Sequence, residues 1–316
     1  MWLFRFAILN WNLSSGKRKK KGGCHDCFRK LPNRYSRVLH ALALNRLEEG
    51  FVDVRNPFYP KRVSRIYFED ADAWMFCTKN PLPLIPYLDR FKQPILMDVT
   101  ITPYKKDLEP AVSDKTKIIE AVRFMGEKLG KDHVSVRYDP ILLNPTYTVD
   151  YHIRAFERLC SLLEGAVETI SISFLDDYKN VRRHAGELNA HEPSEAELKA
   201  IGEAFAKCAA DHGIPVFTCN EKQILAPFGV PSGACFPMEL ALAWTGRKFR
   251  KWKARDCGCV EMADLGVYNT CAHLCRYCYA NFDEKQIAQN RRLHDPSSTM
   301  LVGHLEADDE IIRRKR

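Results

Sequence analysis

The stretch Val134-Ser135-Val136-Arg137-Tyr138-Asp139-Pro140 decides the fold, because it is the clearest strand in the chain. Apolar residues recur at every second position, and Asp-Pro ends the run. Four further apolar or β-branched runs, each followed by polar residues, lie at 73–78, 95–102, 169–174 and 214–218. A helix is predicted before the first run, near 36–49, and further helices are predicted between the runs, near 82–91, 116–129, 150–164 and 194–212.

Strands and helices that alternate in this way predict the α/β class with parallel strands. With about six such units in about 250 residues, a complete or partial (β/α) barrel is the first choice. A doubly wound open sheet is the alternative. In both folds the carboxyl ends of the strands gather at one edge, where the functional site is expected.

Polar residues directly after the strands are the candidates for that site. We predict Lys79, Arg137 and Asp139 as catalytic residues that face the substrate or cofactor; internal ion pairs are the alternative. Other polar residues follow strands in the same way: Asn80, Asp176, Asn220 and Glu221.

Three cysteines near the C-terminus carry the strongest chemical signal. Cys271, Cys275 and Cys278 have the spacing C-x3-C-x2-C. Three thiolates on one loop can hold three irons of a [4Fe-4S] cluster and leave the fourth iron open to a substrate or cofactor. Structural zinc sites have four ligands in two pairs, so zinc and unligated thiols are weaker alternatives. His273 is expected to be a neighbour of the cluster and not a ligand.

An open iron is what S-adenosylmethionine radical enzymes use to bind and cleave their cofactor, and the C-x3-C-x-Y-C motif is similar to the signature of that superfamily. Tyr277 and Asn281 are the candidate cofactor-binding residues beside it. An electron-transfer or redox-sensing iron–sulfur protein, without cofactor cleavage, is the alternative function.

The chain more closely resembles an uncharacterised prokaryotic family, domain of unknown function 1848, over about residues 44–305. Several separate motifs carry this resemblance in order, among them Asn56-Pro57-Phe58, Lys79-Asn80-Pro81, Leu108-Glu109-Pro110, Tyr138-Asp139-Pro140, Cys257-Gly258-Cys259 and the cysteine loop. The resemblance implies a barrel like that of radical enzymes, with an unknown substrate.

The cysteine loop lies near the C-terminus, whereas the radical enzyme superfamily carries it near the N-terminus. A circularly permuted barrel explains this position if a strand at 264–268 closes the barrel beside the first strand. We therefore expect an irregular basic segment at 1–34, a barrel-like domain at 35–256, a cluster-binding segment at 257–305 and a charged tail at 306–316. In place of the first strand that the family carries, this chain has Lys17–Lys21 and Cys24-x-x-Cys27.

The chain has 12 cysteines, and most of the others also fall in groups. Four of them, Cys219, Cys235, Cys257 and Cys259, are candidates for a second metal or cluster, with unligated thiols as the alternative. The pair Cys24 and Cys27 has no matching second pair, so an unstructured segment is expected there. The isolated Cys77, Cys160 and Cys208 are interpreted as small buried hydrophobes.

The net charge of +8 comes from the two ends of the chain. Without the runs Lys17–Lys21 and Arg313–Arg316, 39 basic residues remain against 40 acidic ones. Solvated tails are the simpler interpretation, and a nucleic-acid-associated metal protein is a further alternative function. The sequence contains no long apolar run and no signal peptide pattern, so we expect a cytoplasmic protein without a membrane partner. A ferredoxin or flavodoxin is the expected electron donor.

Overall fold

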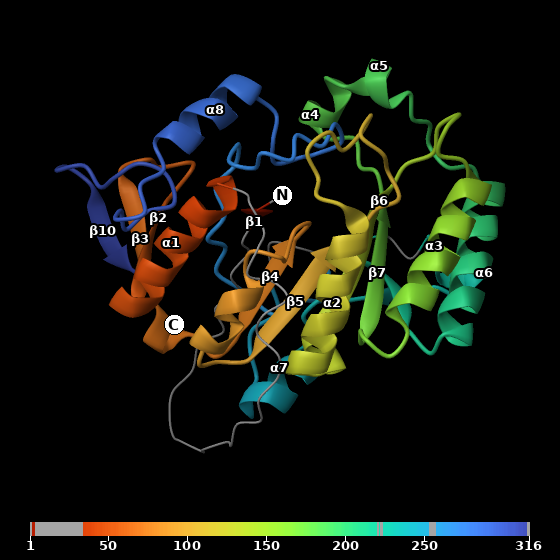
Figure 1. The fold of residues 1–316 in the computed structure, drawn as a ribbon, viewed down its shortest axis with the longest axis horizontal. Coiled ribbons are helices and arrows are strands. Elements are labelled where there is room, and N and C mark those ends of the chain that lie inside the picture. The colour runs from red at the N-terminus through yellow and green to blue at the C-terminus, as the bar shows by residue number, and fades with distance from the viewer. Residues whose placement is uncertain (1, 4–33, 220, 222–223, 253–256, 315–316) are drawn as a thin grey trace.

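The computed structural model describes residues 2–3, 34–219, 221, 224–252 and 257–314, and it is an α/β fold (Figure 1). The strands are β1 (Trp2–Leu3), β2 (Phe51–Arg55), β3 (Arg62–Tyr67), β4 (Trp74–Thr78), β5 (Ile95–Thr100), β6 (Val134–Ile141), β7 (Thr169–Phe174), β8 (Val216–Cys219), β9 (Ser232–Gly233) and β10 (Glu310–Arg313). The α-helices are α1 (Arg34–Glu49), α2 (Lys115–Leu129), α3 (Val149–Leu163), α4 (Lys179–Arg182), α5 (Ala185–Leu188), α6 (Glu195–Asp211), α7 (Met238–Thr245) and α8 (Glu284–Arg292). Short 3-10 helices are η1 (Phe68–Asp70), η2 (Ile85–Arg90), η3 (Lys131–His133) and η4 (Ala226–Phe228).

The main sheet has the strand order β1-β4-β5-β6-β7-β8-β9. Strands β4 to β9 are all parallel, and β1 joins β4 antiparallel. The α/β class with a parallel sheet is thus confirmed. The parallel strands follow one another in chain order without the reversal that defines a doubly wound sheet. Within the described residues no pairing joins the two edges, so the sheet is not a closed barrel.

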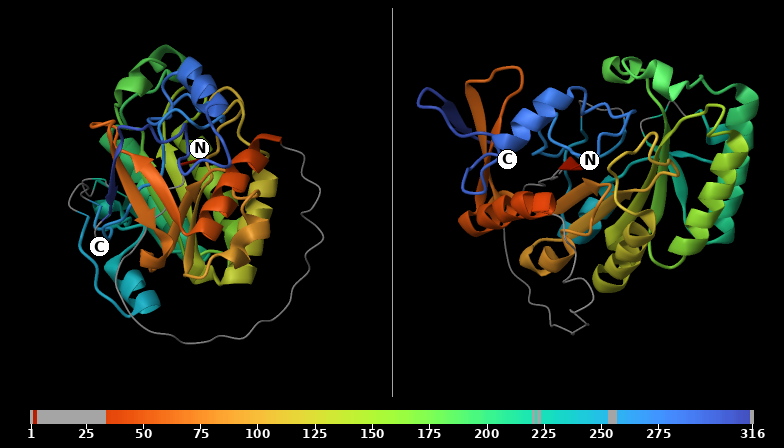
Figure 2. Two further views of the ribbon diagram at one scale, coloured as in Figure 1. Left: turned by 90° about the vertical axis from the view of Figure 1, so that its left-hand side faces the viewer. Right: turned by 45° about the horizontal axis from the view of Figure 1, so that its top comes forward.

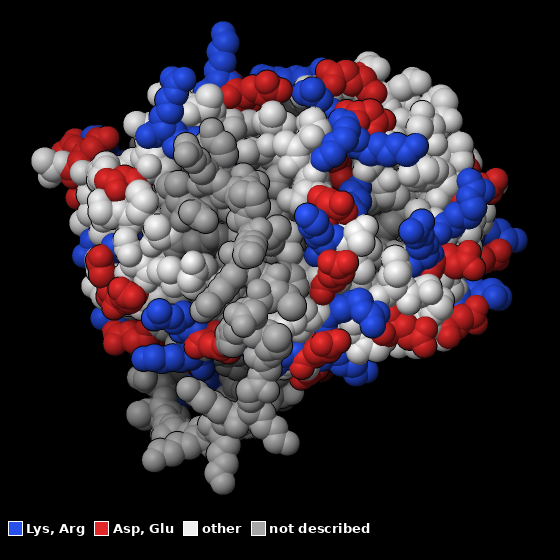
Figure 3. All heavy atoms as spheres, in the orientation of Figure 1, with Lys and Arg blue, Asp and Glu red and all other residues white. Residues whose placement is uncertain are grey.

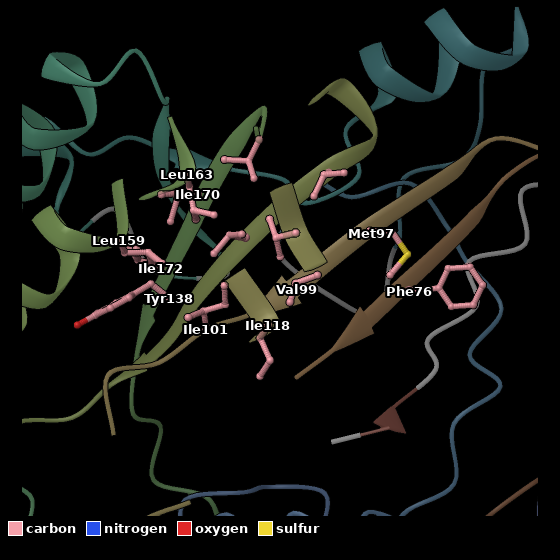
Figure 4. Packing of buried hydrophobic residues seen from close by; sticks show 14 of the residues in the cluster. Phe76, Met97, Val99, Ile101, Ile118, Tyr138, Leu159, Leu163, Ile170 and Ile172 are labelled. Atoms are coloured by element: carbon pink, nitrogen blue, oxygen red, sulfur yellow. The ribbon is translucent and has the colours of Figure 1, made fainter. Parts of the chain in front are cut away.

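The two faces of the sheet differ in chemistry because side chains alternate along each strand. One face packs against α2, α3 and α6 and is apolar, as Figure 4 shows for Phe76, Met97 and Val99 from the strands with Ile118 and Leu159 from the helices. The opposite face carries a mixed set of residues: Met75, Cys77, Leu96, Asp98, Ser135, Arg137, Ser171 and Cys219. That second face is where a polar site can form.

Several predicted helices have the expected bounds, and their ends show why. Ser194 caps α6 in a capping box with Glu197, as the sequence predicts. Asp114 caps α2 by accepting a hydrogen bond from the Thr116 amide. The segment predicted as a helix near 82–91 forms only η2, because the prolines that surround it limit regular helical bonding.

A second sheet of three strands, in the order β10-β3-β2, lies beside α1 (Figure 2). Residues 310–313, expected within a charged tail, form β10 parallel to β3. Arg313 of this strand is 3.0 Å from the Asp70 carboxylate. At the other end of the chain, Trp2–Leu3 pairs with β4, so the segment 1–34 includes a short strand.

The predicted closing strand at 264–268 is wrong, because no strand forms there. Asp264 instead accepts a hydrogen bond from the Gly266 amide at 2.8 Å, which makes a local turn. Such a bond occupies backbone groups that a β-ladder needs. This stretch enters the cysteine loop as irregular chain.

Some predictions concern residues outside the described ones, namely Lys17–Lys21, Cys24, Cys27 and Asn220. Within the described ranges no helix is long and apolar enough to cross a membrane. The face in Figure 3 carries basic and acidic side chains interspersed with one another.

The buried His152 on α3 gives a prediction for the pH dependence of stability. Its ring nitrogens lie 2.9 Å from the Tyr138 hydroxyl and 2.9 Å from the Leu142 carbonyl, and burial lowers its pKa to about 4. An unfolded histidine titrates near pH 6.5, so below that pH the unfolded chain takes up a proton that the folded chain refuses. The free energy of unfolding should therefore fall by about 2 kcal/mol between pH 7.5 and pH 5 through this group.

Urea unfolding at the two pH values tests this expectation. In His152→Gln, the part of the fall in the free energy of unfolding that comes from this group should be absent. His304→Gln, at an exposed histidine, is the matched control and should keep it. A His152→Gln variant with the wild-type pH dependence would contradict the assignment.

Candidate functional site

A cavity of about 380 Å³ opens at the carboxyl ends of the parallel strands. The predicted catalytic residues Lys79, Arg137 and Asp139 all line it. The other predicted site residues on its wall are Tyr277, Cys275, Cys278, Cys219, Cys235, Cys257 and Cys259. Cys271 and Asn281 are not on this wall. The fold therefore brings most of the predicted residues into one place.

The cysteine loop is compact and its three thiols are buried. Cys271 is 3% exposed, and Cys275 and Cys278 are each 7% exposed. Leu274, between the first two cysteines, has a φ of 55°, a left-handed conformation that bulky residues rarely adopt. This turn lets the chain reverse within the motif, so the strain occurs where the three sulfurs must gather.

Hydrogen bonds between side chains and the backbone close the loop around Cys271. The Asn281 side chain accepts from the Cys271 amide at 3.4 Å and donates to the Cys271 carbonyl at 2.6 Å. The His273 amide donates to the Cys271 sulfur at 3.4 Å. Asn281, which the sequence predicts as a cofactor-binding residue, thus holds the backbone of Cys271 in place.

A buried ion pair ties this loop to the sheet. The Lys79 ammonium, just after β4, lies 2.9 Å from the Glu109 carboxylate and 3.0 Å from the Thr102 hydroxyl. The Tyr277 hydroxyl donates to the same Glu109 oxygen, and Lys79 lies 5.5 Å from the centre of the Tyr277 ring. The aromatic residue of the cysteine motif is therefore fixed against the edge of the sheet.

Two backbone hydrogen bonds join the same partners. The Arg276 amide donates to the Leu108 carbonyl at 3.0 Å, and the Ala111 amide donates to the His273 carbonyl at 3.3 Å. Residues before and after Glu109 in the chain thus both bind the cysteine loop through the backbone.

The charges in this network stabilise one another. Burial opposes ionisation of Glu109, but Lys79 and Lys115 outweigh it and lower the pKa of Glu109 to about 2. Lys115 lies 2.8 Å from the second carboxylate oxygen. Burial alone would lower the pKa of Lys79, yet the Glu109 charge raises that pKa above its usual value. The pair is therefore ionised at neutral pH.

Arg137 is the centre of a second polar group on the inner face. Its guanidinium contacts Asp139 at 2.5 Å and Asp98 at 3.4 Å, and it lies 2.8 Å from the Cys235 sulfur. Burial raises the pKa of Asp98 although Arg137 acts against it. Ser173 donates to the other Asp139 oxygen at 2.5 Å. Arg137 and Lys79 therefore form the internal ion pairs that were the alternative to a catalytic role. Both residues also line the cavity.

The four cysteines of the predicted second group meet beside Arg137. The sulfurs of Cys219 and Cys235 are 3.2 Å apart. The Cys259 thiol interacts with both Cys235 and Cys257, and its hydrogen bond to Cys257 lowers the pKa of that thiol to about 6. Gly258 between them has a φ of 72°, a conformation that glycine adopts at little cost.

No group of three or more His, Cys, Asp or Glu side chains in the described ranges is arranged to hold a single metal ion. The cysteine loop nevertheless has the donor set that iron–sulfur clusters use, namely three buried thiols at the C-x3-C-x2-C spacing. Each ligand of such a cluster binds a different iron, so the sulfurs need not converge on one point. Burial of the thiols and the amide that donates to the Cys271 sulfur are compatible with such a cluster, because hydrogen bonds and burial tune its potential.

Sequence reasoning missed three residues of the site. Glu109 entered only as part of the motif Leu108-Glu109-Pro110, yet it is 1% exposed and contacts Lys79, Lys115 and Tyr277. Asp98 lies within an apolar run and gave no signal. Cys77 was interpreted as a buried hydrophobe, but it is half-buried, lines the cavity and lies 3.7 Å from Asp98. The period of two along β4 and β5 places Cys77 and Asp98 on the polar face.

Comparison with known proteins identifies a family without assigning a chemistry. A family model described as a domain of unknown function, DUF1848, matches residues 38–280. No curated protein matches the chain.

Removing the Glu109 charge should destabilise the protein. In Glu109→Gln, two neighbouring lysines lose their shared counter-ion, and breaking a buried pair in this way costs about 3–5 kcal/mol. Glu306→Gln is a matched control, because Glu306 pairs with Lys61 at 2.8 Å but both side chains are exposed. The control should change the free energy of unfolding by under about 0.5 kcal/mol. Equal effects in denaturant unfolding would show that the buried pair does not hold the site together.

Proposed function

We propose an activity for this chain, which belongs to the domain of unknown function 1848 family. It is an iron–sulfur enzyme of the radical S-adenosylmethionine type, with a [4Fe-4S] cluster on Cys271, Cys275 and Cys278. One observation carries the proposal: Cys275 and Cys278 line the same cavity, at the carboxyl edge of the parallel sheet, as Lys79, Arg137 and Asp139.

The chain's own residues support distinct parts of this activity. The three thiolates would hold the cluster, and three protein ligands for four irons would leave one iron for the cofactor. Tyr277, 6% exposed and hydrogen-bonded to Glu109, would shield a cluster on these thiols from water. When bound, the cluster and S-adenosylmethionine supply reductive cleavage of the cofactor and hydrogen abstraction from the substrate.

The polar residues that line the cavity would orient the substrate. Arg137 and Asp139 are fixed by their ion pair and by Ser173, so they present a rigid charged surface without a large cost in side-chain entropy. Asp176 and Glu221 also line the cavity. Burial raises the pKa of Glu221, and the nearby Asp176 adds to that rise.

The sheet supports a finer proposal about the fold. Its parallel strands follow chain order, with helices on one face and the cavity at the carboxyl edge, which is the layout of a partial (β/α) barrel. The cysteine loop comes from the C-terminal part of the chain, so a permuted arrangement would join the loop to the sheet through contacts such as Tyr277 with Glu109, without a closing strand at 264–268. A cytoplasmic ferredoxin or flavodoxin would supply the electron.

Anaerobic reconstitution with iron and sulfide, followed by dithionite and S-adenosylmethionine, tests the activity. The wild type should form 5′-deoxyadenosine, and Cys275→Ala should lower the yield to the level without protein, because the cluster loses one of three ligands. Cys160→Ala is the matched control, since Cys160 is fully buried on α3 away from the cavity. It should keep wild-type yield.

A different result would assign a different function. A reducible cluster that forms no 5′-deoxyadenosine above the Cys275→Ala level would contradict the radical enzyme and favour an electron-transfer or redox-sensing protein. The basic ends of the chain allow a test of the nucleic-acid alternative as well. Binding to nucleic acid with a steep salt dependence would support that alternative.

A further inference from the structure

The cavity has a wall of sulfur that the proposed activity does not use. We propose that Cys219, Cys235, Cys257 and Cys259 form a dithiol–disulfide exchange site for a small disulfide. Cys257 attacks that disulfide first, and the oxidation ends in a bond between Cys219 and Cys235. None of these residues belongs to the C-x3-C-x2-C loop, so the inference goes beyond the proposed function and does not rest on it.

The four thiols form a row in which each thiol interacts with the next. Cys235 donates a hydrogen bond to the Cys219 sulfur at 3.2 Å. The Cys259 thiol hydrogen-bonds with Cys235 on one side and with Cys257 on the other. All four residues line the cavity, so a ligand in the cavity can reach them. The row therefore offers a path along which a disulfide can move by exchange between neighbouring thiols.

Close backbone packing holds this row together without a ligand. Cys219 ends β8 and pairs with Gly233 of β9, two residues before Cys235. A Cβ atom on Gly233 would lie 2.5 Å from the Phe217 ring, so glycine lets β9 approach β8 this closely. The Val260 amide donates to the Phe236 carbonyl at 3.1 Å, which holds the Cys257-Gly258-Cys259 turn against the segment after Cys235.

The spacing of the sulfurs suits disulfide chemistry. A disulfide bond is about 2.05 Å long. The sulfurs of Cys219 and Cys235, at 3.2 Å, are already in contact and need only a small movement to form that bond. All four cysteines are free thiols in this structure, which is the reduced state of such a site. Within the described ranges no group of three or more His, Cys, Asp or Glu side chains is arranged to hold a metal ion.

Cys257 is the thiol best suited to attack first. Its hydrogen bond with Cys259 lowers its pKa to about 6, so Cys257 is a thiolate at neutral pH. The thiolate is the form that attacks a disulfide. At the other end of the row, the hydrogen bond with Cys235 and burial raise the pKa of Cys219, so this thiol keeps its proton until the exchange reaches Cys235.

Arg137 provides a positive charge where the later steps take place. Its guanidinium nitrogen is 2.8 Å from the Cys235 sulfur and 4.0 Å from the Cys219 sulfur. Asp98 and Asp139 fix the guanidinium in this position. A neighbouring arginine stabilises a thiolate, so Arg137 favours each sulfur at the moment it gives up its proton.

The exchange balances in atoms and electrons, with the small disulfide RS–SR as the oxidant. The Cys257 thiolate attacks one sulfur of RS–SR, the S–S bond breaks, and the first RS⁻ leaves. Cys259 then attacks the Cys257 sulfur and releases the second RS⁻. Cys235 attacks the Cys259 sulfur and frees Cys257, and Cys219 attacks the Cys235 sulfur and frees Cys259. The protons that Cys219 and Cys235 lose convert both RS⁻ to RSH, so two thiols are oxidised and one disulfide is reduced.

Reaction of the full chain with bis(2-hydroxyethyl) disulfide in the absence of oxygen tests the proposal. After the remaining thiols are alkylated, mass spectrometry identifies each disulfide by its two cysteines. The wild type should form the Cys219–Cys235 disulfide. Cys257→Ser should form it about tenfold more slowly or less, because the attacking thiolate is missing. Cys219→Ser should stop at a disulfide that contains Cys259.

Cys160 and Cys208 are a matched control inside the same chain. These two thiols also contact each other, between α3 and α6, but neither lines the cavity. They should stay reduced under the same conditions. A wild type without the Cys219–Cys235 disulfide, a Cys160–Cys208 disulfide that forms equally fast, or a Cys257→Ser variant with the wild-type rate would each overturn the proposal. The first two results come from the wild type alone and hold even if a variant does not fold.

The two proposals fail separately. A Cys219–Cys235 disulfide in a chain that forms no 5′-deoxyadenosine would sustain the exchange site and contradict the radical enzyme. Normal 5′-deoxyadenosine from a chain in which this disulfide does not form would do the reverse.

Discussion

The buried ion pair between Lys79 and Glu109 is the interaction on which the rest of the site depends. It joins the end of β4, the loop after β5 and the aromatic residue of the cysteine motif through one carboxylate. An unpaired charge at this depth would be costly, so the three segments are stable only together. Because Tyr277 lies between Cys275 and Cys278, fixing its hydroxyl also fixes where those two thiols face.

The main sheet has one apolar and one polar face, and the Lys79–Glu109 pair lies at its carboxyl edge. One face packs against helices and supplies the stability of the fold, while the other carries Asp98, Arg137, Cys77 and Cys219. Parallel strands in chain order bring every carboxyl end to the same edge, so residues that are far apart in the sequence share one cavity. In our account, the cysteine loop adjoins that cavity through Cys275 and Cys278 and holds one cluster there.

Much of this arrangement could be predicted from the sequence, for identifiable reasons. The strands of the main sheet carry strong periodic signals, and polar residues such as Lys79 and Asp139 directly follow them. The closing strand at 264–268 could not be excluded, because the turn from Asp264 to Gly266 depends on a local hydrogen bond that competes with a ladder. Glu109 could not be recognised, since its partners lie 30 and 168 residues away in the chain. β10 was missed because its edge contact with β3 is set by tertiary packing and not by an apolar pattern.

The most direct test of the central claim is whether S-adenosylmethionine binds the open iron of the cluster on the cysteine loop. The measurement is electron–nuclear double resonance on the reduced protein, with the cofactor labelled by ¹⁵N in its amino group and ¹⁷O in its carboxylate. The anaerobically reconstituted full chain is the sample, and Cys275→Ala is its control. Our account predicts hyperfine coupling to both labels. A spectrum that the labelled cofactor leaves unchanged would contradict it.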